Sequence, residues 1–197
     1  FDISLGNEGV KDEELINSLR DLILHTPKTS GKLFFNQLFG GIDSKAVIGD
    51  LLAVLLNNSM STYKIAGAMV EVEKEIIRQV CDLISYPTTA GGTLPTGGSM
   101  SNFMALIIAR DKKYPKIKHT GNTSRLVCYS SDSSHYSIGK NVSFSGIGRD
   151  NIRYIPTNNK GEMIAEKLIS AIQKDLKDGF CPIFVNATVG TTVMGAI

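Results

Sequence analysis

The second half of the chain alternates short apolar runs with longer helical patterns, and this alternation restricts the fold more than any other feature. A helical pattern over residues 102–113 precedes the apolar run 126–129, and further helical patterns separate the later apolar runs 152–155 and 182–187. Strands that alternate with helices of ten or more residues form βαβ units, so we predict a mainly parallel sheet. Ligands bind at the carboxyl ends of the strands in such sheets, and we expect the functional site there.

The first half of the chain carries helical patterns only. Apolar residues recur at helical spacing in three stretches: residues 8–26, 44–56 and 65–84. Pro87 and the Thr- and Gly-rich residues after it end this part. We therefore expect two domains, an N-terminal helical segment of residues 1–86 and a sheet-containing part of residues 87–197.

Composition and charge are typical of a soluble globular domain. Hydrophobic residues make up 42% of the chain and charged residues 20%, and the 21 basic residues nearly balance the 19 acidic ones. We expect no nucleic-acid partner because the basic residues are scattered. No secretory leader or long apolar span is apparent, and we expect no membrane partner. We expect a cytoplasmic location because the number and spacing of the cysteines suit reduced thiols.

Three cysteines, Cys81, Cys128 and Cys181, lie far apart in apolar segments. An odd number of separated cysteines favours reduced thiols over disulfides, and it argues against a metal site. The chain begins at Phe1 rather than Met and stops just after a predicted strand, so we expect it to be a fragment cut at both ends.

Residues 91–110 place a glycine-rich turn directly before a helix. Gly97 and Gly98 permit a sharp turn and a close backbone approach, and three polar residues follow that supply donors and a cap: Ser99, Ser101 and Asn102. Unpaired N–H groups and the positive end of the helix dipole favour a phosphate at such a junction. A capped helix after a loop, without a ligand, is the alternative interpretation.

Two further polar clusters follow predicted strands, at residues 131–137 and 190–192. Together with the glycine-rich turn they could line one crevice at the edge of the sheet. His135 is the only one of the three histidines in such a position. A lone histidine in a polar loop is more often structural than catalytic, so its position alone leaves both roles open.

Competing motifs fail on spacing. Residues 97–101 place Ser101 at the fifth position, where a nucleophile elbow needs Gly. The same turn lacks the Lys of a phosphate-binding P-loop, and residues 146–151 lack the last Gly of a dinucleotide fingerprint. Hydrolase, nucleotide phosphotransferase and nicotinamide interpretations are therefore weakened.

Six separated segments, taken in order, resemble the group II pyridoxal phosphate-dependent amino acid decarboxylases, closest to the glutamate and cysteine sulfinate decarboxylase branch. The segments are FFNQLFGGID (34–43), TYK (62–64), PTGGSMSN (95–102), SSHYSIGK (133–140), GIG (146–148) and NATVGTTVMGAI (186–197). The resemblance implies an α/β fold, with N-terminal helices followed by the first half of a mainly parallel-sheet, type I aminotransferase-like large domain. Residues 87–197 would then be a partial cofactor-binding domain.

The resemblance also implies roles around pyridoxal 5′-phosphate. Met100 and Ser101 would contact the cofactor phosphate, and Ser99 would shape the turn. His135 would stack on the pyridine ring and assist proton handling as a catalytic residue. Thr192 matches a threonine near the edge of the ring. These roles follow from motif position in the family.

Substrate and partners are implied in the same way. Gln37 would line the substrate pocket, which favours glutamate, aspartate or cysteine sulfinate, while 2,4-diaminobutyrate and aromatic substrates stay open. The family forms homodimers. Two alternatives are another type I pyridoxal phosphate enzyme, such as a carbon–sulfur lyase or aldolase, and an inactive scaffold relative.

The family binds its cofactor covalently through a lysine downstream of the position of Thr192. The aspartate that pairs with the pyridine nitrogen and the arginine for the substrate carboxylate lie downstream as well. Lys140 follows the stacking histidine in the family, and we interpret it as structural. We therefore expect the isolated chain to release no carbon dioxide from amino acids.

Overall fold

The computed structural model describes residues 7–36 and 38–197, and its contacts divide the chain into two compact units, Phe1–Ser59 and Met60–Ile197. Gln37 lies outside the described residues. The first unit contains two helices, α1 (Asp12–His25) and α2 (Ser44–Leu56). The bounds of α2 match the prediction, and Asp43 caps it by accepting the N–H groups of Lys45 and Ala46 at 2.9 and 3.1 Å.

Helix α1 begins four residues later than the predicted start at residue 8. Lys11 is extended and forms the N-cap, and the acidic residues Asp12, Glu13 and Glu14 occupy the first turn. Negative side chains stabilise the N-terminal turn through the helix dipole, whereas Gly9 before it disfavours helix. The helical spacing was predicted correctly, but the start of the helix was wrong.

No described residue of Phe1–Ser59 is buried, and Phe34 alone among them is half-buried. Apolar side chains of both helices are exposed, including Leu19 at 49%, Leu51 at 57% and Leu55 at 79%. This unit has no hydrophobic core among its described residues.

The second unit opens with two helices in place of one. Helix α3 (Tyr63–Ala66) ends at Gly67, and α4 (Ala68–Leu83) begins directly after it. Gly67 has φ 54° and ψ −128°, a combination that side chains disfavour and that interrupts the helix. The predicted continuous helix over residues 65–84 is therefore wrong at its start.

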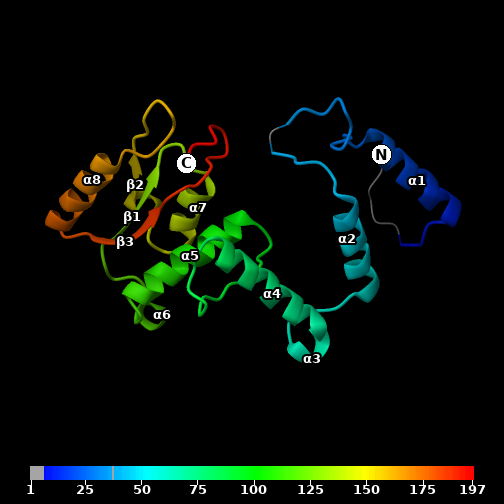
Figure 1. The fold of residues 1–197 in the computed structure, drawn as a ribbon, viewed down its shortest axis with the longest axis horizontal. Helices are drawn as coiled ribbons and strands as arrows, with labels where there is room; N and C mark the ends of the chain where they lie inside the picture. Colours follow the sequence, from blue (N-terminus) through cyan, green and yellow to red (C-terminus); the bar gives the residue numbers. More distant parts are fainter. Residues whose placement is uncertain (1–6, 37) are drawn as a thin grey trace. The chain divides into compact units, whose positions relative to one another are not determined.

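Three parallel strands form the sheet of the second unit, in the order β2-β1-β3 (Figure 1). They are β1 (Leu126–Ser131), β2 (Ile152–Ile155) and β3 (Cys181–Asn186). All six residues of the central strand β1 are buried. A parallel strand covered on both faces is expected to be mostly apolar, which explains why the short runs were recognisable in the sequence. The predicted parallel sheet is confirmed.

Helices cover both faces of this sheet (Figure 1). Leu126 and Cys128 of β1 belong to a core cluster with side chains of α5 (Gly98–Lys113) and α7 (Ser137–Phe144). Val127 and Tyr129 belong to a second cluster, against α8 (Ala165–Lys177). Alternate residues of a strand face opposite sides, so β1 joins the two halves of the core. Short connections are α6 (Ile117–Thr120) and the 3-10 helix η1 (Arg149–Asn151).

A buried polar cluster ties the sheet to α8. Asp175 is 5% exposed and accepts the Tyr129 hydroxyl at 2.9 Å, while Arg153 donates to the same carboxylate through Nη2 at 3.0 Å and Nε at 3.1 Å. Burial, and then the hydrogen bond to Asp175, raise the pKa of Tyr129 above its usual range. Each buried group has a partner, so the cluster fixes β1, β2 and α8 in one arrangement.

None of the described helices has the length and apolar character that a membrane span requires.

Candidate functional site

The glycine-rich turn leads into α5 four residues earlier than predicted. Gly97 is extended and serves as the N-cap, and its carbonyl accepts the N–H groups of Met100 and Ser101 at 3.0 and 3.1 Å. The polar residues Ser99 and Ser101 therefore lie inside the first turn, and no side chain caps the helix. The expected side-chain cap is wrong because the Gly97 backbone already starts the helix.

This start leaves donors on the helix end. Within the described residues, the N–H groups of Gly98 and Ser99 have no acceptor, as expected for the first residues of a helix. A Cβ atom added at Gly97 or Gly98 would meet nothing within 4 Å, so the space beside the turn is open. Ser99, Met100 and Ser101 are exposed there. The turn can therefore accept an anion on backbone donors.

His135 lies in the turn between β1 and α7 and is half-buried. Its Nδ1 accepts the backbone N–H of Ser137 at 3.2 Å and lies 2.8 Å from the Ser137 hydroxyl. The ring of Tyr136 lies against it, with centroids 4.2 Å apart and a tilt of 35°. Lys140 is exposed with its Nζ 4.5 Å from the centre of the Tyr136 ring. The imidazole is thus held at one nitrogen and partly covered by one aromatic ring.

Two amide side chains join the His135 turn to the first turn of α5. Asn102 Nδ2 donates to Ser137 Oγ at 3.1 Å, and Asn141 Nδ2 donates to the carbonyl oxygen of Ser99 at 3.0 Å. Asn141 is 6% exposed and was not predicted. A polar residue between Ile138 and Val142 on a buried helix was the available signal. The structure therefore brings the first two predicted clusters together.

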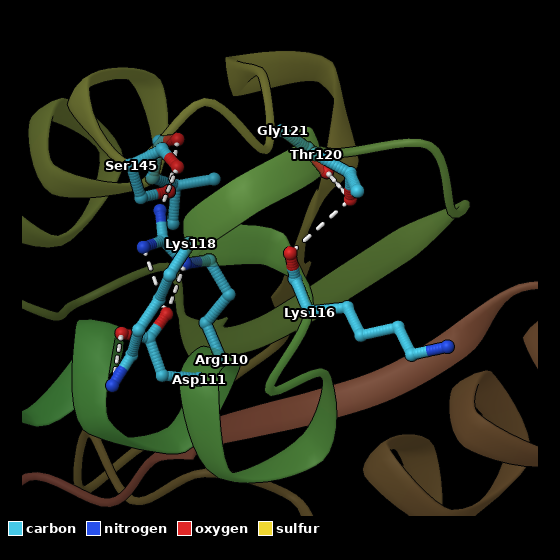
Figure 2. A network of polar contacts seen from close by, with 8 residues as sticks. Arg110, Asp111, Lys116, Lys118, Thr120, Gly121 and Ser145 are labelled. Atoms are coloured by element: carbon cyan, nitrogen blue, oxygen red, sulfur yellow. Dashed lines mark hydrogen bonds and ion pairs between the residues drawn. The ribbon is translucent and has the colours of Figure 1, made fainter.

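The opposite end of α5 is held to α7 as well (Figure 2). Arg110 Nη1 donates to the carbonyl oxygen of Ser145, the residue after α7, and its Nε donates to Asp111 at 2.9 Å. Asp111 also lies 3.7 Å from Lys118 Nζ. Because α5 contacts α7 near both of its ends, its N-terminus is fixed relative to His135.

The end of β3 supports the same turn from another side. Asn186 Nδ2 donates to Ser130 Oγ at 3.0 Å, and Ser130 Oγ donates to Ser134 Oγ at 2.7 Å, next to His135. Asn186 also donates to Thr188 at 3.0 Å. Neither Asn186 nor Ser130 was predicted as a site residue, although both lie at strand ends, where ligands bind in parallel sheets.

The third predicted cluster, residues 190–192, is less directly connected. Thr191 is buried, and its hydroxyl accepts the N–H of Ala196 at 3.0 Å. It lines a cavity of about 260 Å³ together with Ser131, Thr188 and neighbouring loop residues. Thr192 is exposed, and within the described residues no hydrogen bond joins it to His135 or to α5. The geometry thus connects the turns of Ser99 and His135 through Asn102 and Asn141, but it does not connect Thr192 to either.

The cysteines take no part in these contacts. All three are free thiols, and burial raises the pKa of Cys128 to about 12, so its reactive thiolate is suppressed at neutral pH. In the described part of the chain, no group of three or more His, Cys, Asp or Glu side chains could hold a metal ion.

Comparison with known proteins identifies the family. The pyridoxal-dependent decarboxylase conserved domain matches residues 2–197. The acidic amino acid decarboxylase of Xenopus tropicalis is 36% identical over 198 residues, covering 100% of this chain and 39% of that protein. The cysteine sulfinic acid decarboxylase of Rattus norvegicus is 37% identical over 198 residues, covering 100% of this chain and 40% of that protein. The chain thus spans about two fifths of the length of these relatives.

Solved structures agree with this assignment. The crystal structure of mouse CSAD superposes with a TM-score of 0.95 at 36% identity, covering 99% of this chain and 42% of that chain. The structure of Oryza sativa TDC with PLP and tryptamine superposes with a TM-score of 0.86 at 24% identity. This match covers 100% of this chain and 45% of that chain, and it supports the fold alone. The expected fold, N-terminal helices followed by part of a type I aminotransferase-like large domain, is confirmed. This chain therefore belongs to the pyridoxal-dependent decarboxylase family.

Proposed function

We propose that the protein uses pyridoxal 5′-phosphate to remove the α-carboxylate of an amino acid as carbon dioxide. The observation that carries this proposal is the connection between the N-terminus of α5 and His135. Asn102 and Asn141 join the open helix end, which suits a phosphate, to the turn that carries an imidazole. Family membership supplies the identity of the cofactor that would use both.

The residues present fit this cofactor. Its phosphate needs several donors, and the helix end offers the N–H groups of Gly98 and Ser99 together with the exposed hydroxyls of Ser99 and Ser101. Met100 would contribute to the same turn, as the resemblance implies. A planar ring needs a flat neighbour, and His135 can supply it on the face that Tyr136 leaves free. Thr192 is proposed to reach the edge of the ring.

Bound pyridoxal phosphate supplies an electron-withdrawing ring that accepts the electron pair released when the α-carboxylate departs as carbon dioxide. The chain's own residues bind and orient. The N-terminal turn of α5 holds the anionic end, and the clamp between α5 and α7 keeps His135 at a fixed distance from it. His135 would present its second ring nitrogen, Nε2, toward the reacting groups. Such positioning makes a large contribution to enzymatic rates.

We propose an acidic amino acid as the substrate, with glutamate, aspartate or cysteine sulfinate favoured. The relatives support this choice, because they are named acidic amino acid and cysteine sulfinic acid decarboxylases. The assignment of Gln37 to the substrate pocket supports it as well and rests on motif position. We further propose that the whole protein is a cytoplasmic homodimer without nucleic-acid or membrane partners.

The natural full-length protein tests the proposal. It is incubated with pyridoxal phosphate and amino acids labelled in the α-carboxyl carbon, and the released label is counted. We expect release from at least one acidic substrate and little from tyrosine or phenylalanine. Cofactor binding without release from any amino acid would support the inactive scaffold instead. Release of other products, such as a cleaved side chain, would indicate a lyase or aldolase.

A further inference from the structure

The environment of His135 Nδ1 restricts where the imidazole carries its proton. The backbone N–H of Ser137 points at Nδ1 at 3.2 Å, and a backbone N–H is always a donor. Nδ1 must therefore offer a lone pair to this contact. In a neutral imidazole one nitrogen accepts and the other donates, which leaves the proton on Nε2.

The Ser137 hydroxyl reinforces this choice. Its oxygen lies 2.8 Å from Nδ1 and accepts Asn102 Nδ2 at 3.1 Å. With one of its lone pairs occupied by the amide, the hydroxyl can turn its own proton toward Nδ1. This orientation of the hydroxyl gives a directed series of hydrogen bonds, in which Asn102 donates to Ser137 and Ser137 donates to His135.

Burial makes the direction of this series persistent. Ser137 is 2% exposed, so water cannot readily replace either of its partners. The Asn102 donor comes from α5, and the clamps at Asn141 and Arg110 hold this helix against α7. A reversed hydroxyl would bring its lone pair to face that of Nδ1, which already accepts the Ser137 N–H.

We propose that Asn102 and Ser137 are positioning residues that hold His135 in the Nε2–H tautomer. This proposal rests on the proposed function only for the role of the Nε2–H group. That donor would face the cofactor and the substrate. The tautomer itself is inferred from the hydrogen bonds among Asn102, Ser137 and His135. Neither residue needs to touch the substrate, since both act through His135.

Substitutions at Asn102 distinguish a hydrogen-bonding role of this residue from a packing role. An aspartate has the same shape, but its carboxylate accepts the Ser137 hydroxyl proton and turns the oxygen lone pair toward Nδ1. An alanine removes the donor and leaves the hydroxyl free to keep donating to Nδ1. The proposal therefore predicts that Asn102→Asp disturbs the tautomer more than Asn102→Ala. A packing role predicts the opposite order, because aspartate fills the space and alanine does not.

The experiment uses the natural full-length protein labelled with ¹⁵N in histidine, with and without pyridoxal phosphate. Two-bond ¹H–¹⁵N spectra report which ring nitrogen is protonated, and His135→Gln identifies the signals of this residue. We expect Nε2 protonated and Nδ1 unprotonated in the unaltered protein. In Asn102→Asp the Nδ1 signal should move toward the protonated position, while Asn102→Ala stays close to the unaltered protein. Asn122→Asp, an exposed site away from His135, is the matched control.

Each outcome has a distinct meaning. A protonated Nδ1 in the unaltered protein, or a smaller shift in Asn102→Asp than in Asn102→Ala, overturns the positioning role. Absence of carbon dioxide release overturns the proposed function and leaves the tautomer result standing. Where both hold, Asn102→Asp should also lower kcat more than Asn102→Ala at saturating cofactor. Saturation matters because the new carboxylate also repels the cofactor phosphate.

Discussion

At the level of single residues, His135 is positioned by side chains distant in the sequence. Asn102 reaches Ser137 across 35 positions, and Asn141 reaches Ser99 across 42. A third support runs from Asn186 through Ser130 to Ser134. Asn141 is buried, and Asn102 and Asn186 are half-buried, so each amide needs the partner that it has. Each contact therefore has a structural reason as well as a proposed functional one.

Replacement of His135 by alanine is expected to weaken cofactor binding without unfolding the protein. Loss of one stacked aromatic pair costs about 0.5–1.5 kcal/mol, which corresponds to about a two- to tenfold rise in Kd. Titration of the full-length protein with pyridoxal phosphate, followed by absorbance, measures the change. His119→Ala serves as the control because His119 is exposed and lies outside the site. An unchanged Kd and unchanged turnover in His135→Ala would contradict the stacking role.

Cys128 is expected to make the protein less stable at alkaline pH. Burial raises the pKa of this thiol from 9.0 to about 12, so the folded state holds the proton more tightly than the unfolded state. The stabilisation is complete below pH 9 and is lost as the pH rises toward 12. The slope approaches ~1.4 kcal/mol per pH unit for one proton. Urea unfolding under reducing conditions, at pH values between 8 and 10 around the ordinary thiol pKa, measures this slope.

The control for this pH dependence is Cys128→Val, which keeps an apolar side chain in the strand and removes the ionisable group. The substitution should flatten the alkaline decline, whatever it does to stability at neutral pH. An equally steep decline in both proteins would mean that other groups cause it. Tyr129 is the first to consider, since its pKa is raised as well.

At the level of elements, α5 and α7 act as a clamped pair. Hydrogen bonds join them at the N-terminal end of α5 through Asn102 and Asn141 and at its C-terminal end through Arg110. Both helices also pack on the same face of β1 in one core cluster. The arrangement explains how a loop residue such as His135 can be held accurately enough for a role in binding.

Gly67 gives a prediction about the break between α3 and α4. Its φ of 54° lies in the region that disfavours side chains, so Gly67→Ala should cost about 1–2 kcal/mol of unfolding free energy. A new Cβ atom would meet nothing within 4 Å, so the cost comes from the backbone alone. Gly98→Ala is the matched control, because Gly98 lies in a helix with equally open space. Equal effects of the two substitutions in urea unfolding would argue against the backbone explanation.

Helices and strands were predicted correctly where apolar residues recur periodically. They were predicted incorrectly where the backbone conformation of one residue sets a helix boundary. The three strands were recognisable because β1 is buried on both faces and its neighbours are apolar. The break at Gly67 and the start of α5 at Gly98 depend on single backbone conformations that periodicity does not report. In the site, motif position pointed to Ser99 and His135, which the structure joins. Asn141 was missed because its partner is 42 positions away.

For the molecule as a whole, the two units differ in how they are stabilised. Both core clusters lie in Met60–Ile197, around β1 and its flanking helices. The described residues of Phe1–Ser59 form two helices of 14 and 13 residues and bury no side chain. Isolated helices of about 12–15 residues are marginal in water, so the described contacts within this unit add little to the stability of its helices.

Separate expression of the units is expected to show this difference. Residues 60–197 should unfold cooperatively, because they contain the parallel sheet, both core clusters and the Tyr129–Asp175–Arg153 contacts. Residues 1–59 should show little helix on their own, since none of their described side chains is buried to offset the entropy lost in ordering α1 and α2. Circular dichroism during heating measures both. Cooperative melting of residues 1–59 alone, at a concentration where they remain monomeric, would contradict the assignment of the stabilising core to the second unit.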